Sequence, residues 1–236
     1  MANSKHDSET GETYMNVFDI IGPVMIGPSS SHTAGAVRIG RVVNKLCDGQ
    51  DPVKADITLS GSFAETGRGH GTDRAILAGI MGFHSYSPEI KDALNIARDR
   101  GINYSFVNED IRGAHPNTAK ICFRTADGKN GEIMGSSIGG GNIIVSSVNG
   151  MKVEFNGNSN TILIMHMDKP GVIANVTNMM HWQYEDLNIS NFRLSRQEKG
   201  GEAIMTIETD NLPPESLIED IRRINQVTNA ILIRRL

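Results

Sequence analysis

The chain has 236 residues, of which 39% are hydrophobic and 21% are charged, and its formal net charge is −4. This composition predicts a globular protein of one or two domains and argues against a disordered chain. A weakly negative chain gives no reason to expect binding to nucleic acid or to an anionic membrane surface.

The start of the chain, residues 1–13, is polar and lacks the apolar core of a signal peptide. We therefore predict a flexible tail over these residues. No apolar run in the sequence approaches the roughly 20 residues that cross a bilayer. We predict a cytoplasmic protein that does not enter a membrane.

The first predicted element is a helix whose start carries the sequence Gly-Pro-Ser-Ser-Ser-His-Thr-Ala-Gly over residues 27–35. Ser30 or Ser31 is a natural N-cap, because a serine oxygen can accept an unpaired backbone N–H of the first helical turn. Apolar residues then recur at helical spacing as far as Leu46. The sequence therefore predicts a helix that begins at this serine run.

Several hydroxyl groups lie beside one histidine, His32, at the positive end of this predicted helix. Backbone amides, hydroxyls and the helix dipole together favour a carboxylate or phosphate ligand, and histidine can carry a proton near neutral pH. We expect His32 to be a candidate acid/base. The neighbouring hydroxyl residues are candidates for positioning an anion: Ser29, Ser30, Ser31 and Thr33. The alternative is a plain serine cap followed by a loop histidine.

A strand is predicted next over residues 55–60, followed by a glycine-rich loop over residues 61–73 and a second helix with Ile76 and Ile80 on its apolar face. A strand, a glycine loop and a helix start form the general layout of an anion-binding turn, although no dinucleotide or P-loop signature is present. The candidate anion-binding residues in this loop are Gly67, Arg68, Gly69 and His70. The alternative is a mobile loop with solvated side chains.

The middle of the chain predicts a third helix between Ser87 and Gly101, then strands and hairpins. Asn149-Gly150 between two alternating runs is a type I′ hairpin signature. Three consecutive glycines precede this hairpin, and they cost backbone entropy on folding. Either a ligand or another chain approaches the backbone closely there, or the glycines form a flexible turn. The candidates there are Gly139, Gly140, Gly141 and Asn142. We predict one α/β domain over residues 14–155, with helices on a mixed sheet.

A polar linker over residues 156–160 separates this domain from a compact unit over residues 161–236. The unit reads strand, helix, strand, strand, helix, strand, which is the ferredoxin-like plan. In its last strand both faces are apolar, so a partner is expected to cover the face that the helices leave open.

The turn Asp168-Lys169-Pro170-Gly171-Val172 inside this unit resembles that of an ACT domain, a small-molecule regulatory module. In that family amino acids bind between two ACT units, which use the turn of one and the second strand of the other. The resemblance therefore implies dimerisation through this domain and an effector site. Its residues would be Asp168, Pro170, Gly171, Val172, Asn188 and Ser190.

The serine-rich motif of residues 27–35, the preceding Phe-Asp-Ile-Ile-Gly-Pro of residues 18–23 and the ACT-like end together resemble the β subunit of the two-chain, iron–sulfur-dependent L-serine dehydratase. The first domain also resembles the allosteric substrate-binding domain of phosphoglycerate dehydrogenase. The resemblance implies conversion of L-serine to pyruvate and ammonia. It also implies a partner α subunit that holds a 4Fe-4S cluster.

The cysteine content agrees with that assignment of the cluster. The chain has only Cys47 and Cys122, in unrelated contexts, and an iron–sulfur cluster normally takes about four thiolates. We therefore expect no metal ligands in this chain, and two buried, reduced thiols.

Within this resemblance His32 is the expected acid/base or the residue that orients it. Ser30, Ser31 and Thr33 are expected to position the substrate or the subunit junction. Two other functions stay open at this point. One is a non-catalytic regulator that senses an amino acid through its ACT-like unit, and the other is an assembly role in which the serine motif only caps a helix.

Overall fold

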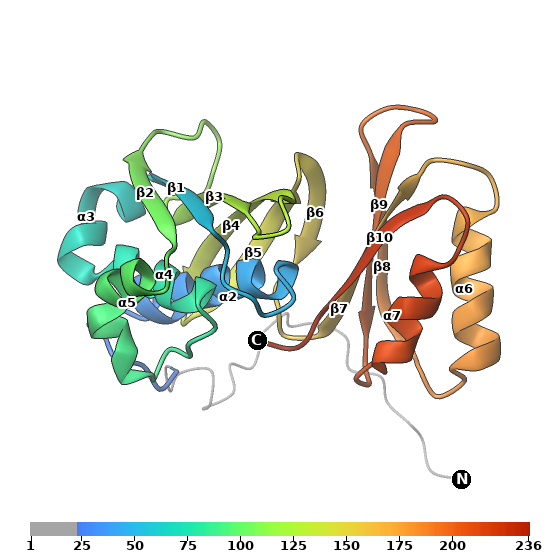
Figure 1. Ribbon diagram of the computed structural model, residues 1–236, viewed down its shortest axis with the longest axis horizontal. Helices are drawn as coiled ribbons and strands as arrows, with labels where there is room; N and C mark the ends of the chain where they lie inside the picture. Colours follow the sequence, from blue (N-terminus) through green and yellow to red (C-terminus); the bar gives the residue numbers. More distant parts are fainter. Residues whose placement is uncertain (1–22) are drawn as a thin grey trace, which may run out of the picture.

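The computed structural model describes residues 23–236. The predicted tail over residues 1–13 and the start of the predicted first domain at residue 14 lie outside the described residues. Figure 1 shows two units side by side, each with one sheet and its own helices. None of the helices within residues 23–236 combines the length and the apolar character that a membrane crossing requires.

The first unit contains a six-stranded sheet in the order β2-β1-β3-β4-β5-β6, in which β1 and β2 are parallel and the other neighbours are antiparallel. This is the predicted mixed sheet. Its strands are β1 (Lys54–Ser60), β2 (Asn103–Asn108), β3 (Thr118–Arg124), β4 (Asn130–Gly139), β5 (Asn142–Val148) and β6 (Met151–Phe155).

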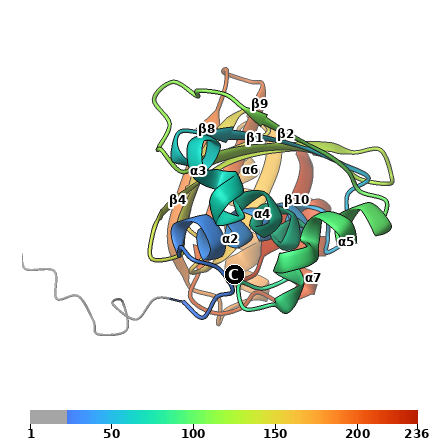
Figure 2. The same ribbon diagram turned by 90° about the vertical axis from the view of Figure 1, so that its left-hand side faces the viewer.

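Helices cover one face of this sheet, as the turned view in Figure 2 shows. They are η1, a π-helix (Ser31–Gly35), α2 (Ala36–Leu46), α3 (Ser62–His70), α4 (Thr72–Ile80), η2, a 3-10 helix (Pro88–Asp92), and α5 (Ala93–Asp99). Fully buried aliphatic side chains of α2, α4 and the sheet meet between these layers, among them Ile39, Ile76 and Ile121. Their burial is the main favourable term in the stability of this unit.

The structure of this unit differs from the sequence analysis in two places. Strand β2 was not predicted, and the glycine-rich stretch after β1 is helix α3 rather than a loop. The helix forms because its Phe63 is fully buried in the core, while Gly67 packs closely on Thr72, where a Cβ atom would lie 3.3 Å from the threonine Cβ. Tertiary packing thus overrides the low helix propensity of glycine. Gly71, with φ of 74°, separates α3 from α4.

The predicted type I′ hairpin is confirmed, because Asn149 and Gly150 both have positive φ angles, of 51° and 74°. The predicted third helix is present in two parts, since residues 88–92 form the 3-10 turn η2 before α5 begins. The three glycines at residues 139–141 all have positive φ and connect β4 to β5 in a tight turn.

The second unit has the predicted element order. It consists of β7 (Asn160–Met167), α6 (Val172–Gln183), β8 (Ile189–Arg196), β9 (Glu202–Thr209), α7 (Glu215–Arg222) and β10 (Val227–Ile233). The sheet order is β10-β7-β9-β8, with every neighbouring pair antiparallel. Side chains of both helices and of one sheet face form a separate apolar cluster that includes Val176, Met205 and Leu217.

The first unit covers part of the other face of this second sheet. Leu163, Ile204 and Ile233 point away from α6 and α7 and join the core of the first unit. The partner expected over this face is therefore, at these positions, another part of the same chain. An ion pair between Arg193 of β8 and Glu154 of β6, 2.9 Å long, lies at the same junction.

Helices α2 and α4 touch through their backbones at two glycines. A Cβ atom on Gly40 would lie 2.2 Å from the carbonyl oxygen of Ile76, and one on Gly79 would lie 2.1 Å from that of Val37. Distances this short leave no room for any side chain, so both positions require glycine.

We predict that Gly79→Ala lowers the free energy of unfolding by about 1–3 kcal/mol, because the added methyl group forces the two helices apart. The matched control is Gly69→Ala in α3, where a Cβ would meet nothing within 4 Å. Alanine there is expected to be neutral or stabilising. Urea-induced unfolding of both variants measures this, and equal stabilities would contradict the prediction.

Candidate active site

The helix of the serine motif begins at Ser31, with Ser30 in the N-cap position as one of the two predictions had it, but the predicted capping bond is not made. Ser30 is already in the helical conformation and its side chain makes no capping hydrogen bond. Instead the hydroxyl of Ser29 accepts the backbone N–H of His32 at 3.4 Å, and the carbonyl of Ser29 accepts the N–H of Thr33 at 2.8 Å. Because these two amides are already paired within the turn, they are not available to hold an anion.

The triple-glycine turn packs on the same helix. A Cβ atom on Gly141 would lie 3.2 Å from that of Ala34, and Arg38 of α2 donates a hydrogen bond to the carbonyl of Gly141 at 3.3 Å. In β4, just before this turn, the side chain of Ser137 fills the space beside Gly35. The close approach expected for these glycines is thus made by another segment of this chain.

The side chain of His32 is directed toward α3. It is only 7% exposed, its Nε2 atom lies 3.0 Å from the hydroxyl of Thr66, and its ring makes an edge contact with Phe63 at 5.2 Å. His70, at the other end of α3, reaches the same hydroxyl, with its Nδ1 atom 3.3 Å away. The two imidazole centroids lie 4.8 Å apart. Folding therefore brings together two histidines that are 38 positions apart in the sequence.

The hydrogen-bond network assigns the proton positions of this cluster. The hydroxyl of Thr66 donates to the carbonyl of Ser62, 2.9 Å away and four residues earlier in α3, since a carbonyl can only accept. Thr66 then accepts from both histidines, so His32 carries its proton on Nε2 and His70 carries its proton on Nδ1. The remaining ring nitrogen of His32 is 3.3 Å from the hydroxyl of Ser29, which donates to it.

This assignment leaves the Nε2 atom of His70, on the ring edge away from Thr66, as an unprotonated acceptor. Burial lowers the pKa of His32 below its ordinary value; the hydrogen bond to the Ser62 backbone opposes this, and the nearby charge of His70 adds to it. The lowered pKa favours the neutral form of the His32 ring.

A cavity of about 230 Å³ lies against this cluster. Its lining residues are Ile26, Gly27, Pro28, Thr33, Gly69, His70, Gly71, Arg74, Ile90 and Lys91. Of the predicted anion-binding residues the lining includes Gly69 and His70, together with Thr33 from the serine motif. It includes neither His32, which lies behind His70, nor Arg68, which is exposed elsewhere on α3. The cavity is smaller than most sites for drug-sized ligands and suits a small molecule.

Sequence reasoning missed four residues of this site. Ser62 and Thr66 lie in the stretch mistaken for a loop, where helical spacing would have aligned them with His70. Arg74 lies near the start of α4, and its cationic side chain just after the glycine stretch was an available signal. Lys91 comes from η2 and no local pattern marks it.

The residues expected to form an effector site do not meet within one chain. Asp168 is paired with Arg196 at 2.5 Å and accepts the backbone N–H of Gly200, at the end of the sheet where β7 finishes. Asn188, which donates to Asp210 at 2.6 Å, precedes β8, and the register places the start of β8 at the opposite end of the sheet. The turn Pro170-Gly171 itself is exposed, and Val172, the first residue of α6, is buried.

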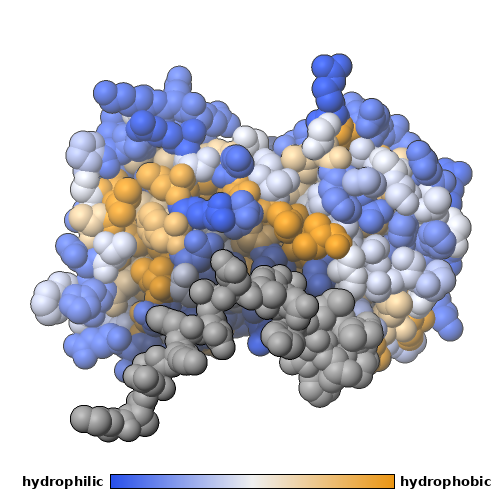
Figure 3. All heavy atoms as spheres, turned by 180° about the vertical axis from the view of Figure 1, so that it is seen from behind, coloured by the Kyte–Doolittle hydropathy of each residue, from blue (hydrophilic) through white to orange (hydrophobic). Residues whose placement is uncertain are grey.

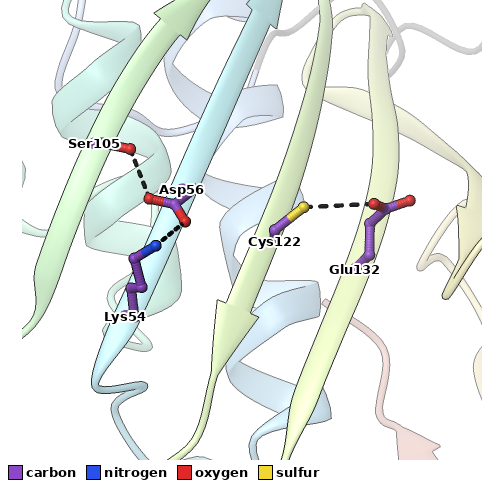
Figure 4. Close-up of polar contacts among 5 residues, drawn as sticks. All are labelled: Lys54, Asp56, Ser105, Cys122 and Glu132. Carbon is purple, nitrogen blue, oxygen red and sulfur yellow. Dashed lines mark hydrogen bonds and ion pairs between the residues drawn. The ribbon is translucent and has the colours of Figure 1, made fainter.

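The two cysteines are separate and differ in burial. Cys47 is buried, which raises the pKa of its thiol to about 12, and the predicted buried thiol is confirmed there. Cys122 is only half-buried and its thiol donates to Glu132 at 3.4 Å, so the prediction of burial was wrong for it. It lies on the sheet face away from the helices, near the ion pair of Lys54 and Asp56 (Figure 4). Across residues 23–236, no three histidine, cysteine or acidic side chains gather as a metal site would require.

We predict that His32→Gln reduces the loss of stability on acidification. Because the pKa of His32 is lowered in the folded protein, the unfolded chain takes up this proton first as the pH falls below about 6.5, and stability declines from there. Urea unfolding at pH 8 and pH 5 measures the difference. The wild type should lose more stability than His32→Gln between these values, and equal losses would show that His32 is not held neutral.

The family model and the similar proteins point to the same family. The family model described as "Serine dehydratase beta chain" matches residues 16–102. The "Probable L-serine dehydratase, beta chain" of Bacillus subtilis is 44% identical over 93% of this chain and 98% of the relative, and the "L-serine dehydratase, beta chain" of Peptoniphilus asaccharolyticus is 36% identical over 92% and 97%. A D-3-phosphoglycerate dehydrogenase of Methanocaldococcus jannaschii is 29% identical over 94% of this chain and 42% of the relative. The chain belongs to the family of L-serine dehydratase β chains.

Proposed function

We propose that this chain acts with a partner α subunit to convert L-serine to pyruvate and ammonia. Relatives named as β chains of this enzyme match it over almost their whole length. The observation that carries the chemistry is His70, which lines the small cavity and is bonded so that its Nε2 atom can accept a proton. The alternative of a non-catalytic amino-acid sensor is not favoured, because the matches to these β chains cover 93% and 92% of this chain.

The reaction requires an acceptor for the Cα proton of serine. As the Cα–H bond breaks, its electron pair forms the Cα=Cβ bond and the β-hydroxyl leaves as hydroxide, which becomes water when the base releases the proton that it took from Cα. The resulting aminoacrylate tautomerises to an imine, and water hydrolyses this imine to pyruvate and ammonia. In this proposal His70 takes the Cα proton on Nε2. Its Nδ1–H bond to Thr66 becomes stronger as the ring becomes charged.

His32 is then a positioning residue. Its short bond to Thr66 holds the hydroxyl that orients His70, and its neutrality avoids a like charge 4.8 Å from the protonated ring. Of the two roles expected from the sequence, acid/base or orientation of the acid/base, the buried geometry supports orientation.

The 4Fe-4S cluster expected for this enzyme belongs, in our proposal, to the partner subunit. Cys47 is buried in the core with a raised thiol pKa, and Cys122 is bonded to Glu132, so neither thiol suits a cluster held by this chain. The residues described here offer the cluster no ligand set. Activation of the β-hydroxyl is accordingly assigned to the partner.

The second unit is assigned as a regulatory ACT domain with a ferredoxin-like fold. Its element order and its sheet order β10-β7-β9-β8 support this assignment. The first unit is assigned as similar to the substrate-binding domain of phosphoglycerate dehydrogenase, a relation supported by the identity to that enzyme. Because the turn at Gly171 and the start of β8 lie at opposite ends of one sheet, an effector site would need two copies of the chain.

Strand β8 offers a surface for that second copy. It is an edge strand, and its Phe192 and Leu194 are 36% and 41% exposed. Figure 3 shows hydrophobic residues gathered on the surface of the second unit. An edge strand with exposed apolar side chains is suited to pairing with its counterpart in another molecule.

We predict that His70→Asn in the assembled two-chain enzyme lowers kcat by about 10²–10⁴-fold, because the proton acceptor is removed. Thr66→Val should lower kcat less and shift the pH profile of kcat/KM, while Thr66→Ser, which keeps the hydroxyl, should restore both. The control is His181→Asn, an exposed histidine on α6. Turnover of His70→Asn within a few-fold of wild type would remove His70 as the base.

We predict that Phe192→Lys converts a dimer of this chain into monomers, since the new charges would repel across the paired β8 edges. Light scattering after size exclusion measures the mass. The control is Leu212→Lys, a change at a residue that is 57% exposed on a loop of the same unit. A wild-type chain that stays monomeric at every concentration would contradict this dimer.

A further inference from the structure

The cavity beside His70 has a positively charged wall that the proposed proton transfer does not use. Arg74 and Lys91 both line it, from α4 and η2. The nearest acid to Arg74 is Asp73, whose carboxylate is 4.0 Å from Nε and already accepts the backbone N–H of Arg74 at 2.8 Å. Among the residues that the structure describes, Lys91 has no ion-pair partner. The two cations therefore remain available to an anionic ligand.

A buried hydroxyl at the same cavity lacks a partner. Thr33 is 2% exposed, it lines the cavity, and its Oγ1 atom makes no hydrogen bond with any described residue. The hydroxyl lies against Gly27, another wall residue, where a Cβ atom would come within 2.0 Å of it. A buried polar group without a partner is unfavourable, and a ligand that forms a hydrogen bond with this hydroxyl would remove that cost.

Size and charge select the ligand. Two cations and a hydroxyl favour an anion over a cation, and about 230 Å³ admits a small molecule only. His70 forms part of the same wall, and in an amino acid the carboxylate is bonded directly to the Cα atom whose proton must reach His70. A carboxylate held by Thr33, Arg74 and Lys91 in a cavity this small would therefore keep Cα near that ring.

We propose that Arg74, Lys91 and the hydroxyl of Thr33 hold the carboxylate of the serine substrate. This inference rests on the proposed function and deepens it, because it names the binding residues that present Cα to His70. It assigns the anion site to side chains of α4 and η2 rather than to the backbone amides of the serine motif.

Steady-state kinetics of the assembled two-chain enzyme provide the test. Arg74→Gln should raise KM for serine by about tenfold or more with a smaller change in kcat, because a contact present in both the ground and transition states is lost. Thr33→Val should raise KM and Thr33→Ser should restore it. The matched control is Arg98→Gln, which removes a charge from the exposed face of α5.

L-serinamide lacks the carboxylate, so its binding reports every contact of the substrate except those that the carboxylate makes. Its inhibition constant should be the same for wild type and Arg74→Gln, whereas the dissociation constant for pyruvate, measured by calorimetry, should rise in the variant. An unchanged KM in both Arg74→Gln and Thr33→Val, or equal effects on serine and serinamide, would overturn the inference. So would a site that binds inorganic phosphate but not pyruvate. A wild-type complex without turnover would instead refute the proposed function itself.

Discussion

The backbone contact between α2 and α4 determines the geometry of the whole first unit. Each helix presents a glycine to the other, at Gly40 and Gly79, and no side chain fits between them. The π-turn that carries His32 runs directly into α2, and α3, which carries His70, runs into α4 through Gly71. Because the two helices can approach in only one way, the segments before them are held side by side, and the histidines meet as a consequence.

The chemistry of the site depends on a single hydroxyl. Thr66 bonds to the carbonyl of Ser62 within its own helix, and this bond makes its oxygen an acceptor for both imidazoles. An intrinsic preference of threonine in helices thus selects the tautomer of each ring. Burial favours the neutral form of His32, whereas the exposed His70 presents a lone pair. In our proposal this difference in burial makes His32 a positioning residue and His70 the base.

The two units share part of one core. Leu163, Ile204 and Ile233 of the second sheet are buried among residues of the first unit. Arg38 of α2 also bridges them, since it donates both to Gly141 in the glycine turn and to Asn156 and Asn158 in the segment between the units. A displacement of the second unit would therefore change the packing around α2, the helix that directly follows the turn carrying His32.

The sequence by itself determined much of this protein: the element order of the second unit, the Asn149-Gly150 hairpin, the mixed sheet, the family, and His32 and His70 as residues of interest. These follow from local periodicity, turn chemistry and short motifs, which act over a few residues. Only the tertiary structure decided that the glycine-rich stretch is helix α3, because the burial of Phe63 outweighs the low propensity of its glycines. It also decided that His70 rather than His32 faces the cavity and that Arg74 and Lys91 join it, since contacts between distant segments arise from packing, which no local pattern records.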